Sequence, residues 1–442
     1  MAIVVTAKER YLAAFETLER EGALSGPSWL ASRRRSAMAR FAEAGFPTTR
    51  DEDWRYTSLA PLTAMSFGPA GGLALELPAG TRPPVALAGT GGPRLVFVNG
   101  RYSSRHSLPS PLPGGGRLSS LAEAMAADGD LLERHLARHA AWEANAFAAL
   151  STAFVADGAV LHVAADTAPT APIELLHLTT TSGVLAQPRV LVVAGPHSRV
   201  CVVERYVGLT DEPSLTNAVT EIVVGPGAAV DHYVLQEQGA GGFHVATIHA
   251  ALDRDSAFST CGVTFGGRLS RTTLTMRFGG EGGHGTLAGL YVAGGRQHVD
   301  NHVIVDHAVP RCSSRQLYKG VLDGSARAVF NGRVVVRPGA QKTDASQTNK
   351  HLLLSDGVEV DSKPQLEIFA DDVRCTHGAA EGQLAPEALF YLKSRGLGDA
   401  TARALLTYGF ARAVVERIAV APVQAHVDRA LLGRLQTPEG SR

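Results

Sequence analysis

The sequence predicts a mainly β fold, in which a β-solenoid (parallel β-helix) core is flanked by helical regions at both ends. From about residue 155, short valine-rich runs recur for about 220 residues, and glycine- and proline-containing turns separate them. Two Gly-Pro turns, at 195–196 and 225–226, lie 30 residues apart, and an alternating strand pattern follows each. Regular short strands also fit a sandwich or a barrel. A quasi-periodic stretch of this length favours the solenoid, because each coil can stack on its neighbour.

The first third of the chain, residues 1–153, is expected to form a mostly helical region with a Gly/Pro-rich connection. Apolar residues at helical spacing predict helices over 8–21 and 28–44, and a glycine follows each of them. Glycine and proline are frequent over 68–117, so this connection is expected to be mainly loop. Residues 118–153 contain no proline and are rich in Ala, Leu and Glu, which predicts further helix.

Two parts follow this region. Residues 154–380 are expected to be the solenoid core, with Val, Leu and Ile buried inside each coil. Its open ends are expected to be interaction surfaces, because exposed sheet edges need covering. Residues 381–442 are expected to form a C-terminal helical domain, in which Pro386 suits a first helical turn. Asp399 is the expected N-cap of the next helix, and a last helix is predicted over about 422–435.

Charge and composition argue against several classes of function. The chain of 442 residues carries 42 Lys+Arg and 42 Asp+Glu, and this balance argues against a nucleic-acid partner. It has no apolar run of roughly 18 residues and no signal-peptide pattern, so neither a membrane span nor export is expected. The four cysteines form no CxxC pair and read as reduced thiols, which favours a cytoplasmic location. A phosphate-binding P-loop is also missing, so no nucleotide is expected to bind by that route.

The densest group of chemically capable residues spans 370–379. Cys375 and His377 are two residues apart, so on an extended strand they point to the same face. A thiolate and an imidazole on one face are suitable ligands for Fe, Zn or Cu. The alternative is a buried cysteine that acts as a small hydrophobe beside a surface histidine. A Cys–His nucleophile pair is a further alternative, but the spacing supplies no third group to orient it.

A second group consists of His298, Asp300 and His302. Their alternation places three potential metal ligands on one strand face. The same pattern is typical of the outer face of a solenoid strand, and we interpret these residues as mainly structural.

A third group is the adjacent pair Asp371 and Asp372. Two carboxylates are the minimum for acid–base cleavage of a glycosidic bond, and a carbohydrate-active β-helix enzyme is therefore an alternative function. Neighbouring residues on a strand point to opposite faces, however, so this pair would not flank one bond. The aromatic content of 6% and the missing export signal also argue against this alternative.

Beyond these groups, the chain resembles the SufB/SufD family of iron–sulfur cluster assembly proteins. The resemblance is densest from about 285 to 420, and residues 52–57 (EDWRYT) also look like a signature of the family. The motifs that carry it are 289–291 (G-L-Y), 300–302 (DNH), 313–320 (SSRQLYKG), 330–332 (FNG), 345–350 (ASQTNK), 352–355 (LLLS), 363–368 (KPQLEI), 371–373 (DDV), 375–379 (CTHGA), 389–392 (LFYL) and 394–396 (SRG). SufB-type chains have His-Glu-Ala where this chain has 377–379 (HGA), which favours the SufD branch of the family.

The resemblance implies a fold and a set of partners. It implies a right-handed parallel β-helix, a heterodimer with a SufB-like paralogue, and a SufC-like ABC-type ATPase bound through the C-terminal helices, about 383–440. It also implies a transient iron–sulfur cluster that this chain shares with its SufB-like partner. By motif position His377 would hold iron or the nascent cluster at the partner interface, and Cys375 matches the pattern too. An imidazole is a reasonable iron ligand, because mixed Cys/His ligation is known for iron–sulfur centres.

We therefore expect a non-enzymatic scaffold subunit for iron–sulfur cluster assembly, which binds no nucleotide itself. A purely structural partner subunit without metal contact is an alternative, and it differs only in predicting that His377 is dispensable. The exposed sheet edge also makes a homodimer of the isolated chain plausible. The polar stretch 346–350 is expected to form an Asn/Gln/Thr ladder between coils that serves stability.

Overall fold

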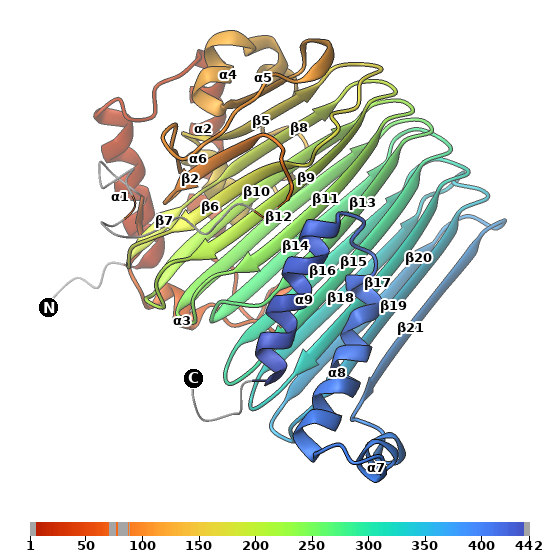
Figure 1. Ribbon diagram of the computed structural model, residues 1–442. Coiled ribbons are helices and arrows are strands. Elements are labelled where there is room, and N and C mark those ends of the chain that lie inside the picture. Colours follow the sequence, from red (N-terminus) through yellow and green to blue (C-terminus); the bar gives the residue numbers. More distant parts are fainter. Residues whose placement is uncertain (1–5, 70–76, 78–86, 88, 437–442) are drawn as a thin grey trace, which may run out of the picture.

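Two long, mainly parallel β-sheets wind through most of the molecule, and helices cover one end and one flank (Figure 1). The computed structural model describes residues 6–69, 77, 87 and 89–436. Most of the segment 70–88 of the predicted loop connection, and residues 437–442 of the predicted C-terminal domain, lie outside the described residues. The predicted mainly β solenoid with helical flanks is confirmed.

The strands alternate between the two sheets along the chain. Sheet A contains β1 (Gly68–Pro69), β4 (Arg117–Ser120), β5 (Gly158–Val163), β7 (Val184–Ala186), β8 (Arg189–Ala194), β10 (Ser214–Val224), β12 (Gly242–Leu252), β14 (Leu269–Phe278), β16 (His298–His307), β18 (Arg327–Val336) and β20 (Glu359–Ile368). Sheet B contains β2 (Arg94–Val98), β3 (Arg101–Tyr102), β6 (Ile173–Thr179), β9 (Arg199–Gly208), β11 (Ala229–Glu237), β13 (Ala257–Thr264), β15 (His284–Ala293), β17 (Ser313–Leu322), β19 (Asp344–Leu353) and β21 (Arg374–Gly382). Eight coils follow within the described residues, from the pair β5 and β6 to the pair β20 and β21.

One residue with positive φ recurs in the turns that lead from a strand of sheet A to the next strand of sheet B, at one corner of the solenoid. Its backbone N–H donates to a carbonyl of the next coil, as His197 does to Pro226 and Asp255 does to Glu281. Residues at this corner with positive φ are Asp166, His197, Gly227, Asp255, Gly282, Arg311 and Lys342. Five of these seven are not glycine, which explains why the sequence shows only a weak repeat.

The space between the two sheets, here called the lumen, is filled by side chains that point inward from alternate strand positions. Valine, leucine and phenylalanine side chains form the largest apolar cluster there, and Val192, Ile222 and Phe330 in it are fully buried. Because the lumen is narrow and packed, it is a core and not a channel.

Helices of the N-terminal region pack on the outer face of sheet A. They are α1 (Ala7–Arg20), α2 (Ser28–Ala44), α3 (Ala60–Thr63), α4 (Leu121–Ala127), α5 (Gly129–His135) and α6 (Ala146–Ala153), with short 3₁₀ turns at Glu52–Trp54 and Pro113–Gly115. The predicted helices over 8–21 and 28–44 agree with α1 and α2 to within one residue. A capping box of Thr6 and Glu9 begins α1, which the sequence analysis did not use.

The prediction of helix throughout 118–153 is only partly right, because the chain between α5 and α6 is not helical. The backbone N–H groups of Ala137, Arg138, His139 and Ala140 donate to the carboxylate of Glu221 at 2.7–3.0 Å. Since these amides bond to a side chain of sheet A, they are not available for an intrahelical ladder.

Three helices follow the last strand: α7 (Pro386–Ser394), α8 (Asp399–Val415) and α9 (Ala421–Gln436). Apolar residues of α8 and α9 share one buried cluster with the outer face of sheet B, in which Val414 and Val427 meet Tyr233. Helix α7 begins at Pro386 as predicted, whereas Gly398, not Asp399, is the N-cap of α8. The carboxylate of Asp399 is turned to Lys393 and Arg403 instead. No helix within the described ranges combines the length and apolar character needed to cross a membrane.

Candidate functional site

The two ends of the solenoid differ in their cover. The last coil, β20 and β21, has no further coil stacked on it, and in the described part of the chain β21 pairs only with β19. Eight of the nine residues of β21 are exposed, and all ten residues of β20 are at least partly exposed. The backbone N–H and C=O groups on the free edge of β21 are therefore open to a partner. We call the exposed faces of β20 and β21 the open end.

The structure places Cys375 and His377 together on this open end. They pair in register with Ala345 and Gln347 of β19, which point into the lumen, so both side chains lie on the lumen side of β21. Cys375 is half-buried beside Ala345, while His377 is exposed. Burial raises the pKa of the Cys375 thiol, which therefore stays protonated at neutral pH unless a metal or a base takes its proton.

Two ligands on one strand are too few to hold a metal ion tightly. Across the described residues, no group of three or more His, Cys, Asp or Glu side chains is arranged to hold a metal ion. Among the described residues, Cys375 and His377 at the open end therefore do not form a complete metal site by themselves.

The second candidate group serves a different purpose. His298, Asp300 and His302 lie on the outer face of sheet A, beneath residues 53–57 of the N-terminal region. Thr57 Oγ1 donates to Asp300 at 2.5 Å and lies 2.9 Å from His298 Nε2. Burial alone would raise the pKa of Asp300, but the positive charge of Arg271 and the contact with His302 outweigh it and hold the pKa well below its usual range. This group anchors the N-terminal segment to the solenoid.

The neighbouring Trp54 completes this anchor. The guanidinium of Arg271 lies 3.7 Å from the centre of the Trp54 ring, and its Nη2 donates to the Asp53 carbonyl at 2.8 Å. On its other side Trp54 stacks on Phe147 at 5.3 Å. The sequence pattern marked this tryptophan segment, but its anchoring role depends on a strand more than 200 residues away.

The carboxylate pair Asp371 and Asp372 lies in the turn before β21, and both residues are exposed. Asp372 forms an ion pair with Lys342 of the preceding coil, and its backbone N–H donates to Gln341 Oε1 at 2.8 Å. These contacts connect two coils, and they do not form the pair of opposed carboxylates that glycoside hydrolysis needs.

Comparison with known proteins fits this architecture. A family model described as the SufBD core domain of SUF-system iron–sulfur cluster assembly matches residues 177–410, and a model of the SufBD N-terminal region matches 5–175. The chain belongs to the SufBD family. It is 33% identical over 424 residues to an iron–sulfur cluster assembly SufBD family protein from Synechocystis, covering 93% of each chain. It is also similar to proteins named SufD from Escherichia coli (30% identical, covering 86% of this chain and 87% of that one) and Bacillus subtilis (26% identical, covering 94% and 95%). The predicted resemblance is confirmed, and the family membership supports a role in iron–sulfur cluster assembly.

Several motifs of the SufBD resemblance are packing devices inside the lumen. A Cβ atom on Gly289 would lie 2.3 Å from the Tyr318 ring, and one on Gly320 would lie 2.2 Å from the Tyr291 ring. Gly289 pairs with Tyr318 and Tyr291 with Gly320, so each glycine makes room for the tyrosine of the neighbouring coil. The hydroxyl oxygen of Tyr291 also lies 2.5 Å from His351 Nε2.

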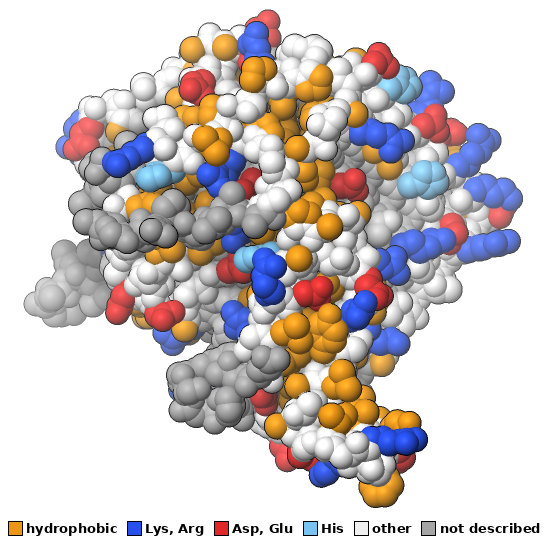
Figure 2. Space-filling view, viewed as in Figure 1, with side chains coloured by type: hydrophobic (Ala, Val, Ile, Leu, Met, Phe, Trp, Pro, Cys, Tyr) orange, Lys and Arg blue, Asp and Glu red, His pale blue; other side chains and the backbone are white. Residues whose placement is uncertain are grey.

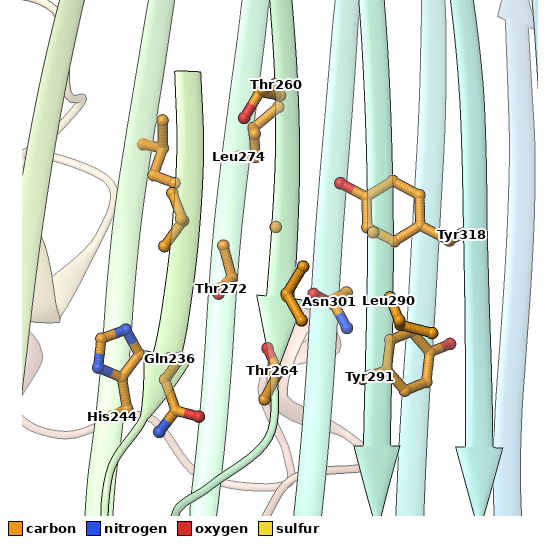
Figure 3. Close-up of a pocket in the computed structure, with 15 residues that line it drawn as sticks. Gln236, His244, Thr260, Thr264, Thr272, Leu274, Leu290, Tyr291, Asn301 and Tyr318 are labelled. Atoms are coloured by element: carbon orange, nitrogen blue, oxygen red, sulfur yellow. The ribbon is translucent and has the colours of Figure 1, made fainter. Parts of the chain in front are cut away.

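A small cavity of about 30 Å³, lined by both polar and apolar side chains, lies in the lumen of this SufBD fold, and sequence reasoning missed it (Figure 3). Gln236, His244, Thr272 and Asn301 line it from four different strands. His244 is fully buried, and this burial lowers its pKa to about 3, so its imidazole is neutral. The volume suits water and excludes a sugar. No spacing rule brings these residues together, because they come from successive coils.

The C-terminal helices of this family member expose a hydrophobic patch. Figure 2 shows hydrophobic side chains gathered over α7 and α8. Phe390 and Tyr391 of α7 are 75% and 56% exposed, and Leu405 of α8 is 50% exposed. No residue of α7 is buried, so this helix projects from the body of the molecule. Large exposed apolar side chains in one place indicate a protein-binding surface.

Proposed function

We propose that this chain is a SufD-type scaffold subunit of a SUF complex, which builds and delivers iron–sulfur clusters together with a SufB-like paralogue and a SufC-like ABC-type ATPase. In this role the chain is not itself an enzyme, and it works in the cytoplasm. The observation that carries the proposal is the open end, where an exposed strand presents Cys375 and His377. The division into 1–153, 154–380 and 381–442 belongs to the same proposal.

The open end is the proposed contact with the SufB-like chain. No described strand pairs with its outer edges, and Ile368 at the end of β20 and the following Phe369 are 41% and 59% exposed. A second solenoid that stacks here would cover both strand edges and these apolar side chains. The same surface would support a homodimer when the isolated chain has no partner.

The nascent cluster is the cargo of this interface. Iron–sulfur clusters take four protein ligands, mostly thiolates. His377, which is exposed, can offer an imidazole nitrogen without any rearrangement of the lumen. Cys375 is half-buried and has a raised thiol pKa, so we assign His377 the first role and Cys375 the second. The SufB-like partner would supply the remaining ligands.

The patch of Phe390, Tyr391 and Leu405 is the proposed docking surface of the ATPase. Its exposed aromatic residues are of the type that dominates protein interfaces. Because α8 and α9 share a buried cluster with sheet B, a force applied at α7 and α8 would reach the solenoid.

The test is an anaerobic affinity purification of the full chain from its own cells, followed by identification of co-purifying proteins and an iron count. We expect a SufB-like protein and a P-loop ATPase, and we expect His377→Ala to keep both partners but lose accumulated cluster. His284→Ala is the matched control, because this histidine is also exposed at a strand position but lies three coils away from β21. Normal cluster accumulation in His377→Ala would support the purely structural subunit instead. Recovery of the chain alone, without metal and with activity on a polysaccharide, would support the carbohydrate enzyme.

A further inference from the structure

A column of two buried glutamines runs through the lumen and ends beneath His377. Gln316 pairs in register with Gln347, and Gln347 pairs with His377. All three positions point into the lumen, and register neighbours on adjacent parallel strands lie about 4.8 Å apart. Gln316 is 4% exposed and Gln347 is 1% exposed, whereas His377 at the top of the column is exposed.

The two amides are buried but incompletely paired. Within the part of the chain that the structure describes, both side-chain polar atoms of Gln316 and the Oε1 atom of Gln347 have no hydrogen-bond partner. The expected hydrogen-bonded ladder between coils is therefore not formed at these two residues. A buried amide oxygen without a donor is unfavourable, so a donor that reaches it is bound preferentially.

The orientation of the Gln347 amide follows from its second contact. Gln347 Nε2 donates to the carbonyl of Gly332 at 3.4 Å, and a carbonyl can only accept. Oε1 is thus the free atom. Gly332 also makes the space, because a Cβ atom there would lie 2.2 Å from Gln347 Nε2. The 330–332 motif and the 345–350 motif of the resemblance therefore act together to hold this one amide.

We propose that Gln347 is a positioning residue for His377. In this proposal the imidazole of His377, the next side chain in the column, turns inward and donates its N–H to the Oε1 atom of Gln347, which has no other donor among the described residues. The other ring nitrogen then keeps its lone pair and faces the open end, where it can bind iron. A hydrogen bond of this kind fixes the tautomer and the ring orientation of metal-binding histidines and increases their basicity. The part of this inference that concerns iron rests on the proposed function.

The first test needs neither iron nor a partner. The full chain is labelled with ¹⁵N in the histidine rings, and the signals of His377 are assigned by their loss in His377→Gln. At pH 9, above the usual range of imidazole titration, we expect one dominant tautomer in the unchanged chain. We expect Gln347→Leu to give a mixture of both tautomers, and Gln347→Glu, which keeps an acceptor, to restore one.

The matched control is Gln316→Leu, which removes an equally buried amide of the same column one coil further from His377. We expect it to leave the His377 signals unchanged. A single tautomer that persists in Gln347→Leu overturns the proposal, and so does an equal effect of both leucine variants. Thermal unfolding of each variant checks its fold, and Gln347→Met, an apolar side chain of similar length, takes over the test if the leucine variant does not fold.

The second test uses the complete complex and Fe²⁺ as the probe. Removal of a residue that orients a metal ligand typically lowers metal affinity 10–100-fold. We expect about a tenfold or greater loss of iron affinity in Gln347→Leu and none in Gln316→Leu. If His377→Ala retains normal iron, the proposed role of His377 fails, while the tautomer measurement still decides whether Gln347 and His377 are coupled.

Discussion

The first and last coils of the solenoid are built from the same strand pattern but end in opposite ways. Strand β5 of the first coil is almost entirely buried, because β4 pairs with its edge and α2 and α4 pack on its outer face, whereas β21 is almost entirely exposed. At the covered end a buried charge network attaches the helices to the sheet. At the open end no cover is present in the described residues, and the residues capable of chemistry gather there. The comparison teaches that one end of the repeat is used for stability and the other is left for association.

The strongest way to break the covered end is to remove its buried carboxylate. The Glu221 carboxylate accepts hydrogen bonds from four backbone N–H groups and forms an ion pair with Arg189 at 2.6 Å. The side chains of Glu221 and Arg189 are at most 1% exposed. We expect Glu221→Gln to lower the free energy of unfolding by about 3–5 kcal/mol, because it leaves a buried arginine uncompensated. Urea unfolding measures this loss, and Glu359→Gln at an exposed ion pair with Arg327 is the control, with an expected change of less than about 0.5 kcal/mol.

The same carboxylate predicts a pH dependence. Burial alone would raise the pKa of Glu221, but Arg189 and the backbone N–H groups lower it below the ordinary value. A lowered pKa in the folded state gives stability that is present above the unfolded pKa of about 4.3 and is lost as the pH falls through the folded pKa. Unfolding measured from pH 7 to pH 3 should show a shallower acid loss in Glu221→Gln than in the unchanged chain.

At the open end, a negative charge introduced by substitution should weaken association with a partner and leave folding unchanged. Phe369 is 59% exposed at the end of β20. We expect Phe369→Asp to weaken partner binding about 30-fold, which corresponds to about 2 kcal/mol, a typical value for an aromatic residue at the centre of an interface. Leu108→Asp, at a residue 61% exposed and distant in register from β21, should bind normally. Unchanged partner affinity in Phe369→Asp, measured by titration, would remove the open end as the proposed interface.

A smaller effect is expected where the N-terminal segment meets sheet A. Thr57→Val removes the donor to Asp300 and the contact with His298, while the volume stays the same. We expect a loss of about 1–2 kcal/mol, because a buried carboxylate loses one hydrogen bond and remains buried. Thr49→Val, at an exposed threonine of the same segment, should change the free energy of unfolding by less than about 0.5 kcal/mol. Equal losses in both variants would contradict the anchoring role.

An effect of similar size is expected at the corner of the coils. Gly227 has φ of 65°, and a Cβ atom there would lie 2.4 Å from Nδ1 of His197 in the preceding coil. We expect Gly227→Ala to cost about 1–2 kcal/mol, from the left-handed backbone and the displaced ring. Gly294→Ala is the control, since nothing lies within 4 Å of its Cβ position and its φ is not in the left-handed region. Differential scanning calorimetry measures the unfolding temperature of each variant, and we expect a decrease in Gly227→Ala that is absent in Gly294→Ala.

Features encoded within one helix or strand were predicted from the sequence, whereas features that depend on contacts between coils were mostly missed. Helix spacing and a following glycine located α1 and α2, and Pro386 located the start of α7, because these signals lie within one element. The spacing of Cys375 and His377 predicted their common face for the same reason. Their exposure was also expected, because the sequence placed them at an open end of the solenoid, and β21 is indeed mostly exposed. The Glu221 network and the Gln347 column were missed, since each joins residues that only the stacking of coils brings together.

The stacking of coils also has a consequence for how the chain folds. Paired residues of neighbouring coils are only 26 to 32 positions apart, as in Phe243 with Leu269 and Arg327 with Glu359. Each coil therefore needs only the one before it as a template, and a solenoid of this kind can grow by addition of one coil at a time. During synthesis the capped end leaves the ribosome first and provides the nucleus, and β21 is the last strand to be added. The surface proposed for the partner is thus completed only after the rest of the solenoid has formed.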